Sequence, residues 1–310
     1  MNTIEALLAA DVPRSSMETL DDALACLEAA SERGRTTGSR AVYAGLASDR
    51  VAYAVLGGYD AAVRKLVAPR ELRRASFCVT EETDGAPSTH PRAMATRLVT
   101  DAARAGRSFV TGTKSFATLA THAGYWIVIA SESVAQAALE GDGRNALRAV
   151  VVERGAPGVT IIPRPPLPFT PEIPHARLEL VDAPVAAILE GDGYERYVKP
   201  FRTVEDAHVT LAIAAYAYGE ARRHVRDGWS TEALVSPMIS LLRIADEADP
   251  TDLATHVALD DALRDAKVAL SALPWDRAPS SIGERWARDC RILDVAGKAR
   301  EKRAQKARRG

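Results

Sequence analysis

Two short stretches of the sequence place hydroxyl-bearing residues and an aromatic ring at the ends of expected strands. The first is Val79-Thr80-Glu81, which is followed by a loop of small residues. The second is the segment GTKSFAT, residues 112–118, which contains Phe116. Strand-end backbone groups and hydroxyls can form hydrogen bonds, and a phenylalanine offers a flat apolar face. From these residues alone, however, a core position explains Phe116 better, and Thr80 is only a hydroxyl at a strand end.

No familiar catalytic or metal-binding motif accompanies these stretches. The sequence has no GxSxG elbow, no Walker loop, no HExxH and no GxGxxG after a strand. The histidines show no ligand spacing, and the three cysteines, Cys26, Cys78 and Cys290, form no CxxC pair. We therefore expect neither a metal site nor a disulfide framework.

The elements that must position these residues change type along the chain, which predicts an α+β protein. Helical periodicity predicts an N-terminal helical domain over residues 1–75. Short runs rich in Val, Ile, Thr and aromatics predict six to eight strands in a central β-domain over 76–192. Their connections are too short for a parallel sheet, so we expect an antiparallel barrel or sandwich. Helical periodicity returns over 193–310 and predicts a C-terminal four-helix bundle.

The expected helices can be delimited by their caps and apolar repeats. Ser15 and Glu18 have capping-box spacing ahead of leucines at helical intervals. A further helix is expected from Ser48 to Val67, where Gly57 and Gly58 would let another backbone come close. The four bundle helices are expected at 204–226, 230–246, 251–272 and 284–308.

Composition excludes some classes of function. The chain of 310 residues has 40 basic and 41 acidic residues, which argues against the broad positive field that nucleic-acid binding requires. No apolar run approaches the roughly 20 residues that span a bilayer, and the N-terminus lacks a basic region ahead of an apolar core. We expect a cytoplasmic protein that binds neither nucleic acid nor membranes.

Residues 75–225 resemble the acyl-CoA dehydrogenase family. FCVTEETDGAPSTHPRAMATRLV is similar to the family's strand ending Leu-Thr-Glu-Pro with its glycine-rich loop. FVTGTKSFATLATHAGYWIVIAS looks like the family signature Asn-Gly-Thr-Lys-Thr-Trp-Ile-Thr-Asn-Ala. The resemblance implies that family's three-part fold, FAD as cofactor and an acyl-CoA or related small-molecule substrate. It also implies a homodimer or homotetramer formed through the C-terminal bundle.

The resemblance also assigns candidate binding residues, position by position. Val79 and Thr80 become the groups that hydrogen-bond the flavin ring. Phe116 takes the place of the family's stacking tryptophan, with Thr118 beside it, so the aromatic face is kept and the indole donor is lost.

Candidate substrate contacts lie in the loop that follows. This loop is longer than the family's loop. The family's Ser-Asp pair therefore aligns with Thr89-His90 only if an insertion is allowed, and Ser88 could take the place of the family's serine. Ser88 and Thr89 are therefore the candidate substrate-binding residues.

A catalytic base is harder to assign. Removing the proton alpha to a thioester requires a carboxylate. The family's usual glutamate, in a Tyr-Glu-Gly-Thr segment, has no counterpart in SALPWDRAPSSIGERWARDC. The family's alternative glutamate lies on the first bundle helix, and the corresponding residue here is Ala207 or Val209, depending on the register. Glu205 lies within a turn of that position, with His208 at i+3 on the same side. Glu205 is the candidate base, and a solvated or capping role is its alternative.

Three functions remain open at this point. The leading hypothesis is an FAD-dependent oxidoreductase of acyl-CoA dehydrogenase type that acts on an acyl thioester or similar acyl substrate. The missing base and the short ends of the chain favour a divergent, non-catalytic FAD- or acyl-CoA-binding protein, or a subunit that complements a catalytic partner. A flavin monooxygenase on the same fold needs no glutamate base, but it needs open access for oxygen.

Overall fold

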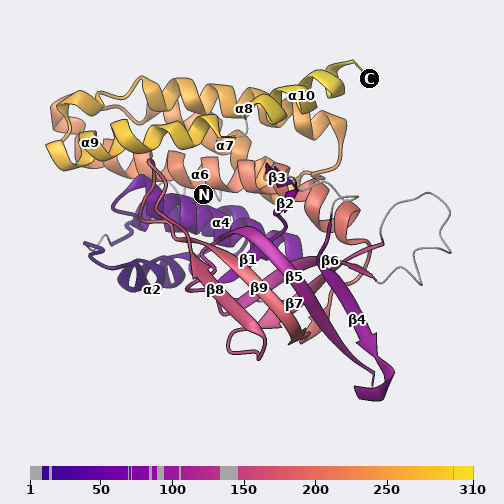
Figure 1. The fold of residues 1–310 in the computed structure, drawn as a ribbon. Helices are drawn as coiled ribbons and strands as arrows, with labels where there is room; N and C mark the ends of the chain where they lie inside the picture. The colour runs from indigo at the N-terminus through magenta and orange to yellow at the C-terminus, as the bar shows by residue number, and fades with distance from the viewer. Residues whose placement is uncertain are drawn as a thin grey trace. The chain divides into compact units, whose positions relative to one another are not determined.

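The structure is a computed structural model that describes residues 9–13, 16–68, 70, 72–83, 86–88, 94–104, 106–132, 146–295 and 297–309. The chain divides into two compact units (Figure 1), which we describe separately. The helical unit consists of Met1–Lys65, Leu167–Glu172 and Arg202–Gly310, and the sheet unit consists of Leu66–Pro166 and Ile173–Phe201. The expected α+β class is confirmed, whereas the division into three domains stays a prediction.

The N-terminal helices of the helical unit are α2 (Leu20–Ser31), α3 (Thr37–Ala47) and α4 (Val51–Val67). The capping box of α2 is formed by Thr19 and Asp22, and the helix begins at Leu20, later than predicted. Ser15, the first residue of the expected capping box, lies outside the described residues. Helix α3 was not expected, because its first turn, Thr-Gly-Ser, carries no apolar repeat. A second capping box, between Thr36 and Ser39, begins this helix instead.

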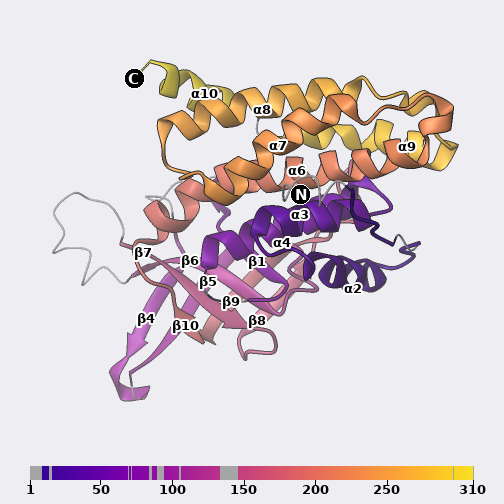
Figure 2. The same ribbon diagram turned by 180° about the vertical axis from the view of Figure 1, so that it is seen from behind.

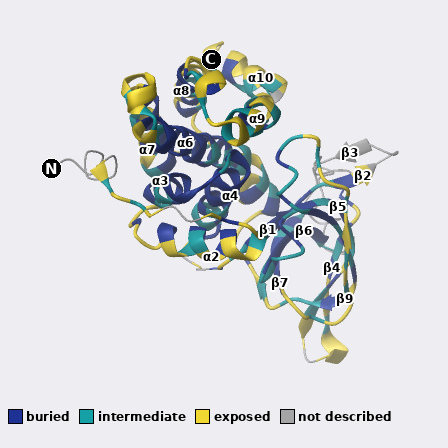
Figure 3. Ribbon diagram, turned by 90° about the vertical axis from the view of Figure 1, so that its left-hand side faces the viewer, coloured by how far each residue is buried: buried dark blue, intermediate teal, exposed yellow. Residues whose placement is uncertain are grey.

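Helices α3 and α4 approach α6 (Lys199–Arg223) very closely through glycines. A Cβ atom on Gly45 would lie 2.2 Å from the carbonyl oxygen of Ala212. A Cβ atom on Gly58 would lie 2.6 Å from the Cα atom of Val209. The expected close backbone approach at Gly58 is therefore confirmed, and most of α6 is buried, as its dark blue colour in Figure 3 shows.

The C-terminal helical section differs from a simple four-helix bundle at its end. The expected helix 284–308 is interrupted by a 3-10 turn, Cys290–Asp294. The carbonyl oxygens of Leu293 and Val295, freed by this break, each accept a hydrogen bond of 2.7 Å from the Arg300 guanidinium. The helices of this section are α6, α7 (Glu232–Glu247), α8 (Leu253–Ser271), α9 (Ser280–Asp289) and α10 (Gly297–Arg308).

The sheet unit contains an eight-stranded sheet with the order β10-β7-β6-β4-β5-β9-β8, and β1 pairs with β6 (Figure 2). Its continuous apolar run YWIVIA forms β6, which is buried along nearly its whole length. The separate hairpin consists of β2 (Glu81–Thr83) and β3 (Ala86–Ser88). The sheet strands are β1 (Ala75–Cys78), β4 (Arg97–Asp101), β5 (Arg107–Thr118), β6 (Tyr125–Glu132), β7 (Leu147–Glu153), β8 (Val159–Pro163), β9 (His175–Pro184) and β10 (Ala187–Ile188).

The sheet is mixed, which corrects the expectation of purely antiparallel pairing. Strand β6 runs parallel to both β1 and β4, while the other pairs are antiparallel. Short connections exclude parallel pairing only between strands that follow one another directly in the chain. Strand β1 reaches β6 over a long connection that includes β4 and β5, and this connection is long enough for a parallel crossover.

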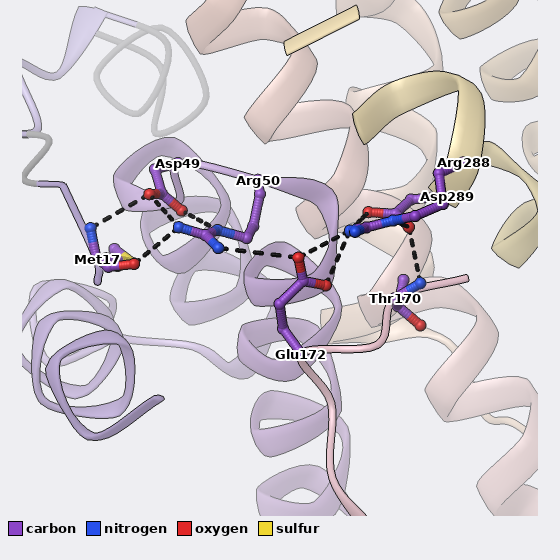
Figure 4. A network of polar contacts seen from close by, with 7 residues as sticks. All are labelled: Met17, Asp49, Arg50, Thr170, Glu172, Arg288 and Asp289. Carbon is purple, nitrogen blue, oxygen red and sulfur yellow. Dashed lines mark hydrogen bonds and ion pairs between the residues drawn. The ribbon is translucent and has the colours of Figure 1, made fainter. Parts of the chain in front are cut away.

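A six-residue segment between β8 and β9, residues 167–172, belongs to the helical unit and is held there by an ionic network (Figure 4). The backbone N–H of Thr170 donates to Asp289 Oδ1 at 2.7 Å. Arg288 Nη2 donates to both carboxylate oxygens of Glu172, at 2.8 and 2.9 Å. Arg50 Nη1 lies 3.8 Å from the same carboxylate. The network therefore joins three segments that are far apart in the sequence.

Candidate functional site

The candidate ring-binding residues Val79 and Thr80 form the link between β1 and β2. Val79 is buried, and its carbonyl accepts a hydrogen bond from Lys114 Nζ at 3.3 Å. The carbonyl of Thr80 accepts from the backbone N–H of Ser115 at 2.8 Å and from the Ser115 hydroxyl at 3.3 Å. Two consecutive residues of β5 thus hold this strand end in place.

A buried ion pair next to this strand end was not recognised from the sequence. Lys114 Nζ donates to Glu81 Oε1 at 2.6 Å, and the two side chains are 0% and 6% exposed. Glu81 also accepts hydrogen bonds from Ala95 N and from the N–H and hydroxyl of Thr96. Burial alone would raise the pKa of Glu81, but the Lys114 charge and these hydrogen bonds outweigh it and lower that pKa. The signal available in the sequence was that Glu81 and Lys114 each lie within one of the two candidate stretches.

The other two candidate ring-binding residues, Phe116 and Thr118, lie on β5 and are half-buried. The Phe116 ring centroid lies 4.3 Å from that of His175, with the planes inclined by 33°. The guanidinium carbon of Arg164 lies 5.7 Å from the same centroid. The Thr118 carbonyl accepts a hydrogen bond from the Ser76 hydroxyl at 2.6 Å.

The structure therefore brings the four candidate FAD residues onto two contacting segments of one unit. The Ser76–Thr118 bond joins β1 to the end of β5, and the Ser115–Thr80 bond joins the residue before Phe116 to the end of β1. The candidate substrate contacts cannot be placed in the same way. Ser88 ends β3 with its backbone opposite Glu81, its side chain is not described, and Thr89 lies outside the described residues.

Glu205, the candidate base, lies on α6 in the helical unit. Burial raises its pKa to about 7, and Asp206 reinforces the shift while Arg202, Arg300 and Arg303 oppose it. The two arginines of α10 bind the neighbouring Asp206 instead, with Arg303 Nη2 at 2.7 Å and Arg300 Nη1 at 3.5 Å. A carboxyl group with a pKa near 7 can exchange protons at neutral pH, as a general base must.

His208, one turn further along α6, has a structural role. Its Nδ1 lies 2.8 Å from the carbonyl oxygen of Val204, and its Nε2 lies 3.0 Å from the Thr37 hydroxyl. Burial lowers its pKa to about 4, so the ring is neutral at pH 7. Both nitrogens are engaged, so His208 is not available to take a proton from a substrate.

Within the described ranges, no three His, Cys, Asp or Glu side chains gather in a way that could hold a metal ion. Among the helices that the structure describes, none is long and apolar enough to cross a membrane.

Comparison with known proteins identifies the class of fold. Residues 76–182 match the model of the acyl-CoA dehydrogenase middle domain. Butyryl-CoA dehydrogenase from Megasphaera elsdenii is 13% identical and superposes with a TM-score of 0.65, covering 93% of this chain and 89% of that chain. The chain therefore has the acyl-CoA dehydrogenase fold, and the resemblance predicted from its sequence is confirmed.

Two further similar structures are named for their flavin. An FAD-dependent dehydrogenase is 12% identical with a TM-score of 0.61, and the match covers 96% of each chain. PigA, solved with FAD and proline, is 11% identical with a TM-score of 0.59, covering 87% of this chain and 86% of that chain. No curated protein matches the sequence.

Proposed function

We propose that this protein binds FAD and acts as an FAD-dependent oxidoreductase on an acyl thioester or a similar acyl substrate. The placement of Val79, Thr80, Phe116 and Thr118 on contacting segments of the sheet unit carries this proposal. Thr80, Phe116 and Thr118 are half-buried, so a ligand can reach them, while the bonds from Lys114 and Ser115 hold the strand end rigid. A planar ring with polar edges fits this set of groups.

In the proposed site each residue has a separate task. The backbone N–H groups of Val79 and Thr80 and the Thr80 hydroxyl would hydrogen-bond the ring heteroatoms, Phe116 would pack against the ring, and Thr118 would lie beside it. When bound, FAD would supply the hydride acceptor. Glu205 is the proposed proton acceptor, and Ser88 and Thr89 remain proposed substrate contacts. Assembly as a homodimer or homotetramer is part of the same proposal.

One observation favours a second function, an FAD- or acyl-CoA-binding protein without turnover. The segment that lacks the family's usual glutamate includes Trp275 and Trp286, whose rings stack at 4.0 Å. Both tryptophans are buried, and the indole N–H of Trp275 donates to the Leu270 carbonyl at 2.8 Å. This segment packs into the core of the helical unit and contains no counterpart of the family's glutamate, so without a base at Glu205 the protein would bind FAD or acyl-CoA without turnover.

The first experiment tests FAD binding, by titration of the purified protein with FAD and measurement of its visible spectrum. Phe116→Ala is expected to weaken FAD binding by about tenfold, because the stacking face is lost. Phe109→Ala is the matched control, since Phe109 is another half-buried phenylalanine of β5 and contacts Arg104 instead. If the wild-type protein takes up no FAD, the proposed function is wrong.

The second experiment tests turnover by adding a panel of acyl-CoA thioesters to the flavin-loaded protein without oxygen. A dehydrogenase is expected to lose its flavin absorbance on addition of its substrate. Glu205→Gln should abolish this bleaching while leaving FAD uptake intact, because the amide cannot accept the proton. Unchanged bleaching in the variant would exclude Glu205 as the base, and FAD uptake without any bleaching would support the non-catalytic binding protein.

A further inference from the structure

Strand β9 begins with a buried histidine that packs against the proposed flavin-facing aromatic. His175 is 8% exposed, and its ring centroid lies 4.3 Å from that of Phe116. The two strands are paired at this point, with His175 opposite Thr118. Phe116 itself lies in an irregularity of this pairing, between Lys114 and Ala117, and its ring meets the imidazole there.

The backbone on both sides of this histidine is held by the sheet unit. The carbonyl of His175 accepts a hydrogen bond from the backbone N–H of Arg164 at 2.8 Å. The carbonyl of the preceding residue, Pro174, accepts one from the backbone N–H of Leu119, also at 2.8 Å. These two bonds fix the backbone from which the imidazole extends to Phe116.

Burying a histidine at this position costs free energy of folding, which suggests that its ring has a function there. Within the part of the chain that the structure describes, the buried Nδ1 atom makes no hydrogen bond of good geometry. Burial lowers the pKa of His175 to about 4, although the backbone of Ile173 opposes this shift and the Arg164 charge reinforces it. A leucine would fill similar space without a buried polar atom, but it would lack the flat face that contacts Phe116.

We propose that His175 is a positioning residue for flavin binding: its imidazole supports one face of Phe116, so that the phenyl ring is already oriented when the isoalloxazine packs on the other face. This inference rests on the proposed function. A benzyl group that is ordered before binding loses less conformational entropy on binding. Arg164 also lies near the ring, but its side chain and its ion-pair partner Glu82 are 36% and 44% exposed, so this solvated pair holds the arginine only weakly.

The test compares an aromatic with an aliphatic replacement. His175→Phe keeps a flat ring at this position and is expected to bind FAD within about twofold of the wild-type affinity. His175→Leu removes the ring and is expected to weaken FAD binding by about three- to tenfold, the range typical of an aromatic pair. The readouts are the dissociation constant from flavin fluorescence and the visible circular dichroism of the bound flavin, which reports its orientation. Thermal unfolding without FAD verifies that both variants fold.

The outcomes separate this inference from the proposed function. Equal affinity and equal flavin dichroism in the wild-type protein and His175→Leu would overturn the positioning role while FAD binding stands. Equal losses in His175→Leu and His175→Phe would also overturn it, because an aromatic ring would then be insufficient. If His175→Leu does not fold, His175→Met provides the aliphatic comparison, and failure of both to fold would make His175 a core residue only. A wild-type protein that binds no FAD would refute both proposals.

Discussion

Glu205 and Asp206 are neighbours on α6, but their environments give them different roles. Asp206 accepts a 2.7 Å hydrogen bond from Arg303 and faces Arg300. Burial instead raises the pKa of Glu205 to about 7. A carboxyl that stays partly protonated at neutral pH is suited to proton transfer. The raised pKa of Glu205 should also make the free energy of unfolding depend on pH.

We predict that Glu205→Gln stabilises the protein more at pH 8 than at pH 5. The folded-state pKa of Glu205, about 7, lies above its ordinary value of 4.5, so folding favours the protonated carboxyl. The stability that the folded wild-type protein gains from protonated Glu205 is fully present below about pH 4.5 and is lost as the pH rises through about 7. The free energy of unfolding of the variant should exceed that of the wild type by on the order of 1–2 kcal/mol at pH 8, and by much less at pH 5.

Urea unfolding at the two pH values measures this difference. Glu284→Gln is the control, because Glu284 is an exposed glutamate on α9. A stability difference between Glu205→Gln and the wild type that does not change with pH would contradict the raised pKa.

At the scale of secondary-structure elements, the packing of α4 on α6 depends on a residue with no side chain. A Cβ atom on Gly58 would lie 2.6 Å from Val209 Cα and 2.7 Å from the His208 carbonyl oxygen. Both are backbone atoms of α6, so a side chain at residue 58 requires one helix to move. This contact also adjoins the buried His208, whose two hydrogen bonds depend on the same helix positions.

We predict that Gly58→Ala lowers the free energy of unfolding by about 1–3 kcal/mol, because overpacking between backbones outweighs the better helix propensity of alanine. Gly219→Ala on α6 is the matched control. A Cβ atom there would meet the flexible end of Arg223 at 3.1 Å, so this variant should be neutral or more stable by up to about 1 kcal/mol. Thermal or urea unfolding measures both, and a stabilised Gly58→Ala would show that the helices are not so close.

At the scale of the whole molecule, ionic contacts join segments that lie far apart in the chain. Glu172 lies between Arg288 of α9 and Arg50, which directly precedes α4, while Asp289 binds the backbone of Thr170. The side chains of Glu172 and Arg50 are 18% and 12% exposed. Partly buried charges of this kind are costly to leave without their partners.

We predict that Glu172→Gln lowers the free energy of unfolding by about 1–3 kcal/mol, because two arginines lose their shared carboxylate. Glu179→Gln is the matched control, since Glu179 pairs with Arg177 on the exposed face of β9 and the side chains are 37% and 43% exposed. That change should cost less than about 0.5 kcal/mol. Equal effects of the two substitutions on urea unfolding would show that the network adds no stability.

The sequence by itself determined the features that depend on neighbouring residues. Helical and strand periodicity identified the α+β class, and the buried run that forms β6 was recognised from its unbroken apolar residues. Two local signatures, around Thr80 and Phe116, were enough to indicate the acyl-CoA dehydrogenase fold. These features can be recognised in the sequence because each depends on residues within a single strand or helix.

Only the tertiary structure decided the features that depend on contacts between distant segments. The parallel pairing of β1 with β6 and the Lys114–Glu81 ion pair each join residues more than 30 positions apart. The stack of His175 on Phe116 and the raised pKa of Glu205 depend in the same way on burial by other elements. A local sequence pattern does not identify these partners, because strand register, burial and the charges around a site are defined only when the chain has folded.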